Sequence, residues 1–222
     1  YYDLSQSLEF EYILMLKGLD MRITEIAEYM RDPTPEKFLD IVNAKKLEID
    51  KRIKELKQTR KVLQAKRDQI TLCNNLKNLE LEIDEYKKEK LLALPFKSSD
   101  DIVSSISRFE DKKQLRMGVG LMISAEKLLD GDFFNYDYIY THALNNNLSQ
   151  NIIHRPQGEY IVCYHKGEAS TLSYAYQKII SFAKENNLML VGYAYEKGLN
   201  EFVISREEDY WIKIIVKTEK RS

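Results

Sequence analysis

The chain has 222 residues and a formal net charge of −1, which allows one or two domains plus a connecting helix and favours no class of charged partner. Its two cysteines, Cys73 and Cys163, lie far apart in the sequence, which argues against a disulfide framework and indicates a reducing, cytoplasmic compartment. No apolar run approaches ~20 residues, so we expect no transmembrane helix and no membrane partner.

Two short helices are predicted before residue 33. The first carries apolar residues from Leu8 to Leu16 and ends near Gly18, because glycine tolerates the left-handed conformation of a helix C-cap. The second begins at Arg22 or Thr24 and has an apolar face formed by Ile23, Ile26, Ala27 and Met30. Two prolines then mark a linker, because each disfavours helical conformation in the residue before it.

A long, charged helix is predicted from Pro35 to about Lys90, with Thr34 as its N-cap. Apolar residues recur every seven positions, which indicates a coiled-coil seam: Val42, Ile49, Leu56, Leu63 and Ile70. A helix of this length would span roughly 80 Å, too long for small flanking domains to cover. We therefore expect a homodimer, although the periodicity does not give the direction of pairing.

The heptad pattern of this helix slips between Thr71 and Asn75, which are poor helix formers. We expect a bend or break there, followed by a short second helix with apolar residues at Leu72, Leu76, Leu79, Ile83 and Tyr86. From Val42 to Ile70 the segment carries ten Lys and Arg against four Asp and Glu. Such a run most often marks the solvated surface of a coiled coil.

The remainder predicts one α+β domain with an antiparallel sheet, because the order strand, helix, strand, strand occurs twice. The expected strands are Leu91–Phe96, Met117–Ser124, Phe133–His142, Glu159–His165, Met189–Glu196 and Tyr210–Thr218. The expected helices are Asp100–Glu110, capped by Ser98 or Ser99, and Ser170–Asn187.

No catalytic or metal-binding constellation stands out. The three histidines are scattered, and Gly118-Val-Gly120 lacks the third glycine and the following helix of a phosphate-binding loop. We therefore predict no catalytic residue, no metal site and no cofactor.

Aromatic residues are the informative feature of the C-terminal domain. Tyr136, Tyr138 and Tyr140 alternate, so on a strand they would share one face, as would Tyr193 and Tyr195. A cleft lined by such rings suits flat, apolar or cationic ligands. Glu196 would point away from Tyr195. The local pattern favours an interpretation of Glu196 as a solvated residue at a strand end. In the alternative interpretation, its carboxylate lies at the base of an aromatic pocket. There it would be costly to ionise without a cation, so the pocket would select positively charged ligands.

The segments Tyr1-Tyr2-Asp-Leu-Ser-Gln and Leu16-Lys17-Gly-Leu-Asp-Met-Arg-Ile-Thr-Glu-Ile26 resemble the second half of a MerR-family DNA-binding domain. The resemblance implies that Tyr1, Tyr2 and Lys17 contact the DNA backbone. It also implies that the helix-turn-helix lies before Tyr1, outside this chain.

A second stretch resembles the effector-binding domain of GyrI-like proteins, in the version fused to multidrug-binding MerR regulators. It runs from Pro156 to Gly167 and resumes as Gly192-Tyr-Ala-Tyr195-Glu196. The resemblance makes Glu196 the leading site residue and implies a ligand pocket that also includes Tyr195, Tyr193, Tyr210, Tyr160 and Tyr138. Gly167 stands where some family members have bulkier residues, so the resemblance does not fix the shape of the pocket or the class of ligand.

The resemblances predict three segments: 1–33, the end of a MerR-type DNA-binding domain; 34–90, a dimerisation coiled-coil helix with linker; and 91–222, a GyrI-like effector-binding domain. They imply a homodimer with an antiparallel coiled coil that binds promoter DNA, acts with RNA polymerase and responds to an aromatic, cationic small molecule. Ligand binding would favour a state that bends and untwists the promoter.

Two other functions stay open at this level. The chain could be a dimeric small-molecule-binding module without a role in transcription. It could also be a GyrI-like hydrolase in which Glu196 and Tyr160 or Tyr195 activate water, although no second acid–base group is evident.

Overall fold

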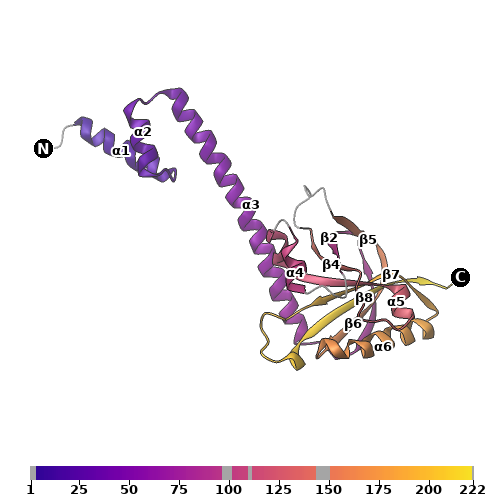
Figure 1. Ribbon diagram of the computed structural model, residues 1–222. Helices are drawn as coiled ribbons and strands as arrows, with labels where there is room; N and C mark the ends of the chain where they lie inside the picture. The colour runs from indigo at the N-terminus through magenta and orange to yellow at the C-terminus, as the bar shows by residue number, and fades with distance from the viewer. Residues whose placement is uncertain (1–3, 97–101, 110–111, 144–150, 222) are drawn as a thin grey trace. The chain divides into compact units, whose positions relative to one another are not determined.

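The computed structural model describes residues 4–96, 102–109, 112–143 and 151–221 (Figure 1). The chain divides into two compact units, residues 1–60 and 61–222, which are described separately. Within the described residues, no helix is both long and apolar enough to cross a membrane.

The first unit contains α1 (Leu4–Gly18), α2 (Ile23–Arg31) and the first part of α3 (Pro35–Cys73). Its small core is formed by Leu16, Met21 and Ile26, against which side chains of α2 and α3 pack. The two predicted helices are confirmed. The left-handed residue after α1 is Asp20, with a φ of 59°, and not Gly18.

The start of α3 follows the sequence prediction. The backbone N–H of Lys37 donates to the Thr34 hydroxyl at 3.3 Å, so Thr34 caps the helix and Pro35 is its first residue. No described residue of α3 is buried. The seam residues Leu56 and Leu63 are 62% and 65% exposed. The seam is thus uncovered in a single chain.

The prediction that helix continues to about Lys90 is wrong. The helix ends at Cys73, inside the predicted break, and β1 (Glu80–Tyr86) and β2 (Glu89–Pro95) follow. β1 pairs antiparallel with β6, with Glu80 opposite Tyr164 and Tyr86 opposite Gly158. Over so short a segment, apolar residues spaced three and four positions apart resemble the pattern of a helix. The pairing with β6, distant in sequence, makes the segment a strand.

The second unit is built on one sheet, in which every pair of neighbouring described strands is antiparallel. Its order is β1-β6-β8-β7-β3-β4-β2-β5. The later strands are β3 (Val119–Ser124), β4 (Tyr138–His142), β5 (Ile152–Arg155), β6 (Gly158–Lys166), β7 (Leu188–Gly198) and β8 (Trp211–Lys220). The helices are α4 (Ile102–Ser107), α5 (Ala125–Leu129) and α6 (Leu172–Glu185), with 3₁₀ turns η1 (Lys112–Met117), η2 (Ala169–Thr171) and η3 (Glu207–Asp209).

The mixed fold with two strand, helix, strand, strand halves is confirmed, with additions. β1, α5 and β5 were not predicted. β4 begins only at Tyr138, so the predicted strand from Phe133 is too long and Tyr136 precedes it. The predicted caps Ser98 and Ser99 lie outside the described residues.

The sheet has two different faces. On the helix face, α6 packs on residues that include Ile123, Ile161 and Ile214 (Figure 1). On the opposite face, here called the tyrosine face, four buried tyrosine rings gather together with Trp211: Tyr140, Tyr160, Tyr164 and Tyr195. Cys73 and Leu76, at and just after the end of α3, pack against this second cluster. Both faces of the sheet are therefore covered, and side chains that alternate along a strand enter different cores.

Candidate functional site

Glu196 is a buried carboxylate on the helix face of β7. Its side chain is only 5% exposed, and it lies opposite Leu121 of β3 and Ile214 of β8 in the sheet. Because side chains alternate along a strand, its neighbour Tyr195 enters the tyrosine face instead. The predicted opposite orientation of these two side chains is confirmed, and the interpretation of Glu196 as a solvated residue is wrong.

Two tyrosine hydroxyls from different elements donate hydrogen bonds to this carboxylate. Tyr176 of α6, itself fully buried, donates to Oε1, and Tyr136, between α5 and β4, donates to Oε2 at 3.0 Å. Phe133 stacks on the Tyr176 ring with centroids 5.5 Å apart. The carboxylate is thus held from both sides by neutral donors.

Burial dominates the electrostatics of the site. Loss of solvent raises the pKa of Glu196 to about 7, and the hydrogen bonds from Tyr176 and Tyr136 lower it only in part. Burial beside this carboxylate raises the pKa of both tyrosines well above the usual range, so both stay protonated and act as donors. No cationic side chain among the described residues forms an ion pair with Glu196.

A cavity of about 590 Å³ opens beside Glu196 on the helix face. The walls are mostly apolar and aromatic, with Glu196 as the buried acid among them. They are formed by Ile102, Val119, Gly120, Leu121, Phe134, Tyr136, Ile139, Ala169, Ser170, Leu172, Glu196, Lys197, Gly198, Tyr210 and Ile212. A mostly apolar pocket with a few polar and charged groups, here including Glu196 and Lys197, is a typical small-molecule site.

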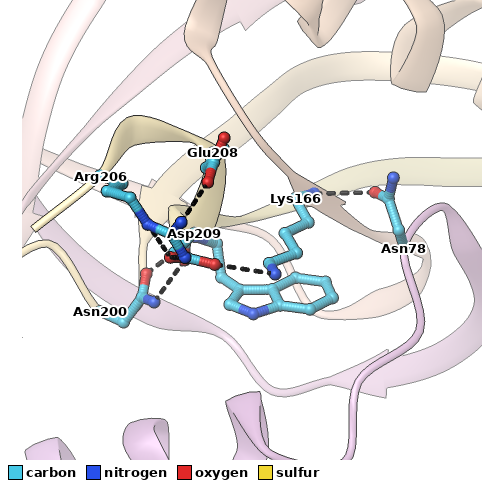
Figure 2. Close-up of polar contacts among 7 residues, drawn as sticks. Asn78, Lys166, Asn200, Arg206, Glu208 and Asp209 are labelled. Atoms are coloured by element: carbon cyan, nitrogen blue, oxygen red, sulfur yellow. Dashed lines mark hydrogen bonds and ion pairs between the residues drawn. The ribbon is translucent and has the colours of Figure 1, made fainter. Parts of the chain in front are cut away.

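Tyr210 reaches the cavity from a segment that polar contacts hold in place (Figure 2). Asn200 donates to the carbonyl oxygen of Asp209 at 2.8 Å and accepts from the backbone N–H of Trp211 at 2.8 Å. The Asp209 carboxylate also accepts from Arg206 and from Lys166 of β6. The residues on both sides of Tyr210 are therefore fixed by side chains distant in sequence.

Two glycines allow the close packing around the site. A Cβ atom at Gly198 would collide with the hydroxyl of Tyr210. A Cβ atom at Gly120 would collide with the carbonyl oxygen of Glu196 and the ring of Tyr140. Both positions must lack a side chain for β3, β7 and Tyr210 to approach as they do.

The predicted ligand-binding residues separate into two groups. Glu196 and Tyr210 line one cavity on the helix face. Tyr195, Tyr193, Tyr160 and Tyr138 belong to the cluster on the tyrosine face. The prediction of a single pocket is therefore wrong. The prediction that Tyr136, Tyr138 and Tyr140 share one face is also wrong, because Tyr136 packs with the helix-face core. Tyr160 and Tyr195, the tyrosines named in the hydrolase alternative, lie on the tyrosine face, whereas Tyr136 and Tyr176 contact Glu196.

Sequence reasoning did not select Tyr136 or Tyr176 as site residues. Tyr176 lies on the buried stripe of α6 with Leu172, Ala175 and Ile179, and a phenol in such a stripe needs a hydrogen-bond partner. That signal was present in the sequence. Tyr136 had no comparable signal, because its orientation depends on where β4 begins.

The predicted DNA contacts are only partly described. Lys17 is exposed in the last turn of α1, whereas Tyr1 and Tyr2 lie outside the described residues. Among the side chains that the structure describes, no group of three or more His, Cys, Asp or Glu could hold a metal ion.

Comparison with known proteins identifies both parts of the chain. Residues 95–218 match the family described as GyrI-like small molecule binding domain, and residues 9–66 match the family described as MerR, DNA binding. The chain is 31% identical over 236 residues to the Multidrug-efflux transporter 2 regulator of Bacillus subtilis (strain 168), covering 99% of this chain and 83% of that protein.

The solved structures that match this chain are more distant in sequence. An EcmrR–DNA complex is 20% identical, covers 100% of this chain and 86% of its own, and has a TM-score of 0.49. A hydrolase from Listeria innocua is 10% identical, covers 69% of this chain and 98% of its own, and has a TM-score of 0.44. The family rests on the sequence matches: the chain belongs to the MerR-type regulators that carry a GyrI-like small molecule binding domain.

Proposed function

We propose that this ligand-responsive transcription regulator binds aromatic cations in the cavity beside Glu196. The observation that supports the proposal is a buried carboxylate with neutral donors on both oxygens and no cationic partner among the described residues. Ionisation of such a group in a dry site is costly until a positive charge arrives. A cationic ligand would supply that charge, and the aromatic walls would attract it further.

Within this proposal each side chain has its own role. Glu196 neutralises the ligand charge. Tyr136 and Tyr176 keep the carboxylate oriented, because each donates to a different oxygen. Phe134 and Tyr210 line the cavity and provide ring surface for a flat ligand.

We further propose that the regulator acts as a homodimer on promoter DNA, together with RNA polymerase, in the cytoplasm. The exposed seam of α3 supports the dimer, because Leu56 and Leu63 have no cover in one chain. The family assignment supports the DNA partner. A ligand can change promoter geometry only by binding one state of the dimer more tightly than another.

Calorimetric titration with benzyltrimethylammonium and its neutral carbon isostere, neopentylbenzene, tests the ligand class. We expect the cation to bind at least tenfold more tightly, and Glu196→Gln to remove this preference while the protein stays folded. Glu85→Gln, an exposed glutamate on β1, is the matched control. Equal binding of the two compounds, or an unchanged preference in Glu196→Gln, would contradict the proposal.

Transcription from the cognate promoter tests the regulatory step. With the native protein and RNA polymerase, the cation should change transcript yield, and Glu196→Gln should abolish that response without abolishing DNA binding. A mutant that responds like the wild type would show that the Glu196 cavity is not the sensor.

A further inference from the structure

A second cavity lies on the tyrosine face of the sheet, opposite the site of Glu196. Its volume is about 300 Å³. Strands β1, β2, β4, β5, β7 and β8 line it together with the end of α3 and the end of η1. The lining side chains are Gln69, Leu72, Tyr86, Glu89, Met117, Tyr140, His142, Arg155, Tyr195, Lys197, Leu199, Lys213 and Ile215. The proposed function makes no use of this cavity.

The charge in this second cavity is mainly positive. Arg155, Lys197 and Lys213 face a single carboxylate, that of Glu89. Glu89 is already engaged, with its Oε2 at 2.7 Å from Arg155 and its Oε1 at 2.5 Å from the His142 ring. Lys197 and Lys213 form no ion pair with any residue that the structure describes. Among the described residues, neither ammonium group therefore has a carboxylate at ion-pair distance, although Glu89 and Glu201 attract Lys197 from further away.

Burial makes this excess charge costly. Loss of solvent, reinforced by the charge of Lys66, lowers the pKa of Lys197 to about 8. Lys213 lies between two rings, 5.5 Å from the Tyr86 centroid and 5.4 Å from that of Tyr164. Burial lowers the pKa of Lys213, but hydrogen bonds with the hydroxyls of Tyr86 and Tyr164 raise it by more, so the charged form of Lys213 is retained. An anion placed in the cavity would stabilise both ammonium groups, since the attraction between opposite charges is stronger in a buried site than in water.

Polar atoms without partners also border the cavity. Within the described part of the chain, the Nε of Arg155 and the Oε1 of Gln69 are buried and make no hydrogen bond. Arg155 itself is only 12% exposed. Unsatisfied buried groups are rare and costly in folded proteins, and two at one cavity indicate a missing polar ligand. Arg155 Nε is a donor for an anion, and Gln69 Oε1 can accept from a hydroxyl.

The remaining walls fit an aromatic body. Tyr86, Tyr140 and Tyr195 contribute rings, and Leu72, Met117, Leu199 and Ile215 contribute apolar surface. The guanidinium carbon of Arg155 lies 4.6 Å from the Tyr86 ring centroid, so the cationic end and the aromatic end of the cavity adjoin. The volume admits a single small ring with its substituents.

We propose that this second cavity binds a small aromatic carboxylate, held by Lys213, Lys197 and Arg155, independently of the cation site on the helix face. The second cavity also adjoins α3. Gln69 and Leu72 belong to α3, the helix with the exposed seam, so a ligand here would contact that helix directly. The regulator would then accept ligands of opposite charge on the two faces of one sheet.

The test uses 4-hydroxybenzoate and its uncharged analogue 4-hydroxybenzamide in calorimetric titrations. The carboxylate should bind at least tenfold more tightly than the amide, and Lys213→Met should weaken it at least fivefold. Lys197 borders both cavities, so Lys213, which lines only the second cavity, is the cleaner position. Methionine preserves the length of the side chain and removes its charge.

Two reciprocal controls separate this proposal from the function of the first cavity. Glu196→Gln should leave 4-hydroxybenzoate binding unchanged, and Lys213→Met should leave benzyltrimethylammonium binding unchanged. Equal affinity for acid and amide, or full affinity in Lys213→Met, would overturn the anion site whatever happens at Glu196. Loss of carboxylate binding in Glu196→Gln would overturn the independence of the two cavities.

Discussion

Tyr176 of α6 donates its hydroxyl hydrogen to Oε1 of Glu196 on β7, and both side chains are buried in the same core. This bond joins the second helix of the domain to the strand that carries the candidate ligand-binding acid. Tyr136 completes the arrangement from the other side of the carboxylate at 3.0 Å. The acid is thus oriented before any ligand arrives, which reduces the ordering cost of binding.

The stability of the protein should fall as pH rises through the range in which Glu196 ionises. The folded-state pKa of Glu196 is raised to about 7 from 4.5, so between these values the unfolded chain releases a proton that the folded chain retains. Because the folded chain binds this proton more tightly than the unfolded chain, the free energy of unfolding falls as pH rises, by about 3 kcal/mol at most. Glu196→Gln should remove this loss and be more stable than the wild type at pH 8.

Urea unfolding at pH 5 and pH 8 measures the effect. Wild type and Glu196→Gln should differ more at pH 8 than at pH 5, whereas the exposed control Glu85→Gln should follow the wild type. A constant difference between wild type and Glu196→Gln at both pH values would show that Glu196 is not buried as an acid with a raised pKa.

The affinity for an aromatic cation should rise with pH and then level off. The cation binds the ionised carboxylate, and below a pKa of about 7 that form declines with each unit of pH. The dissociation constant of benzyltrimethylammonium should therefore increase about tenfold per pH unit below the pKa and be constant above it. Titrations from pH 5 to pH 8 would reveal this, and a flat profile in the wild type would contradict it.

Removing the Tyr176 hydroxyl should shift that pH profile upward. Its hydrogen bond favours the ionised carboxylate, so Tyr176→Phe should raise the pKa of Glu196 further and move the midpoint of cation binding to higher pH. Tyr136→Phe should act in the same direction with a smaller shift, since its hydrogen bond lowers the pKa of Glu196 less. An unsatisfied buried acceptor also costs about 1–3 kcal/mol of unfolding free energy.

The two phenylalanine variants control for each other. Each variant loses one hydroxyl beside Glu196. If the substitution only loosened the core, it would lower the free energy of unfolding without moving the pH midpoint of cation binding. If the pH midpoint of cation binding stays at the wild-type value in both variants, the two tyrosine hydroxyls do not affect the pKa of Glu196.

The α3 seam should be the dimer interface. Leu56→Asp places a charge in the seam and should dissociate the protein to monomers in sedimentation experiments, because a buried unpaired charge is costly. Leu47→Asp is the matched control, because Leu47 is 72% exposed and lies off the seven-residue pattern. If Leu56→Asp remains dimeric at the same concentration, or Leu47→Asp dissociates equally, the seam is not the interface.

Local patterns predicted several features accurately. The α3 start at Pro35, with its Thr34 cap, needs only neighbouring residues, and the break near Thr71 follows from poor helix formers. The opposite orientation of Tyr195 and Glu196 follows from the two-residue period of a strand. The family resemblance, more than the local pattern, raised Glu196 above its neighbours.

Other features were beyond local patterns. The segment Glu80–Tyr86 becomes a strand because it pairs with β6, about eighty positions further along the chain. Leu79 adopts a left-handed conformation with a φ of 59°, which a continuous right-handed helix does not permit. The same pairing brings Tyr86 to the tyrosine face, where it packs in the same cluster as the end of α3 and Tyr160.

The sequence by itself determined the main strand, helix, strand, strand order of the two halves, the helical seam and the two faces of β7, because these depend on backbone periods and on nearest neighbours. It did not determine β1, α5 or β5. Only the tertiary structure decided which side chains meet Glu196, and that the tyrosines divide between two cavities. Tyr136, Tyr176 and Tyr210 come from separate segments, and their convergence depends on strand pairing and helix packing across the whole sheet. Contacts between distant segments are set by the burial of whole faces, which no local period encodes.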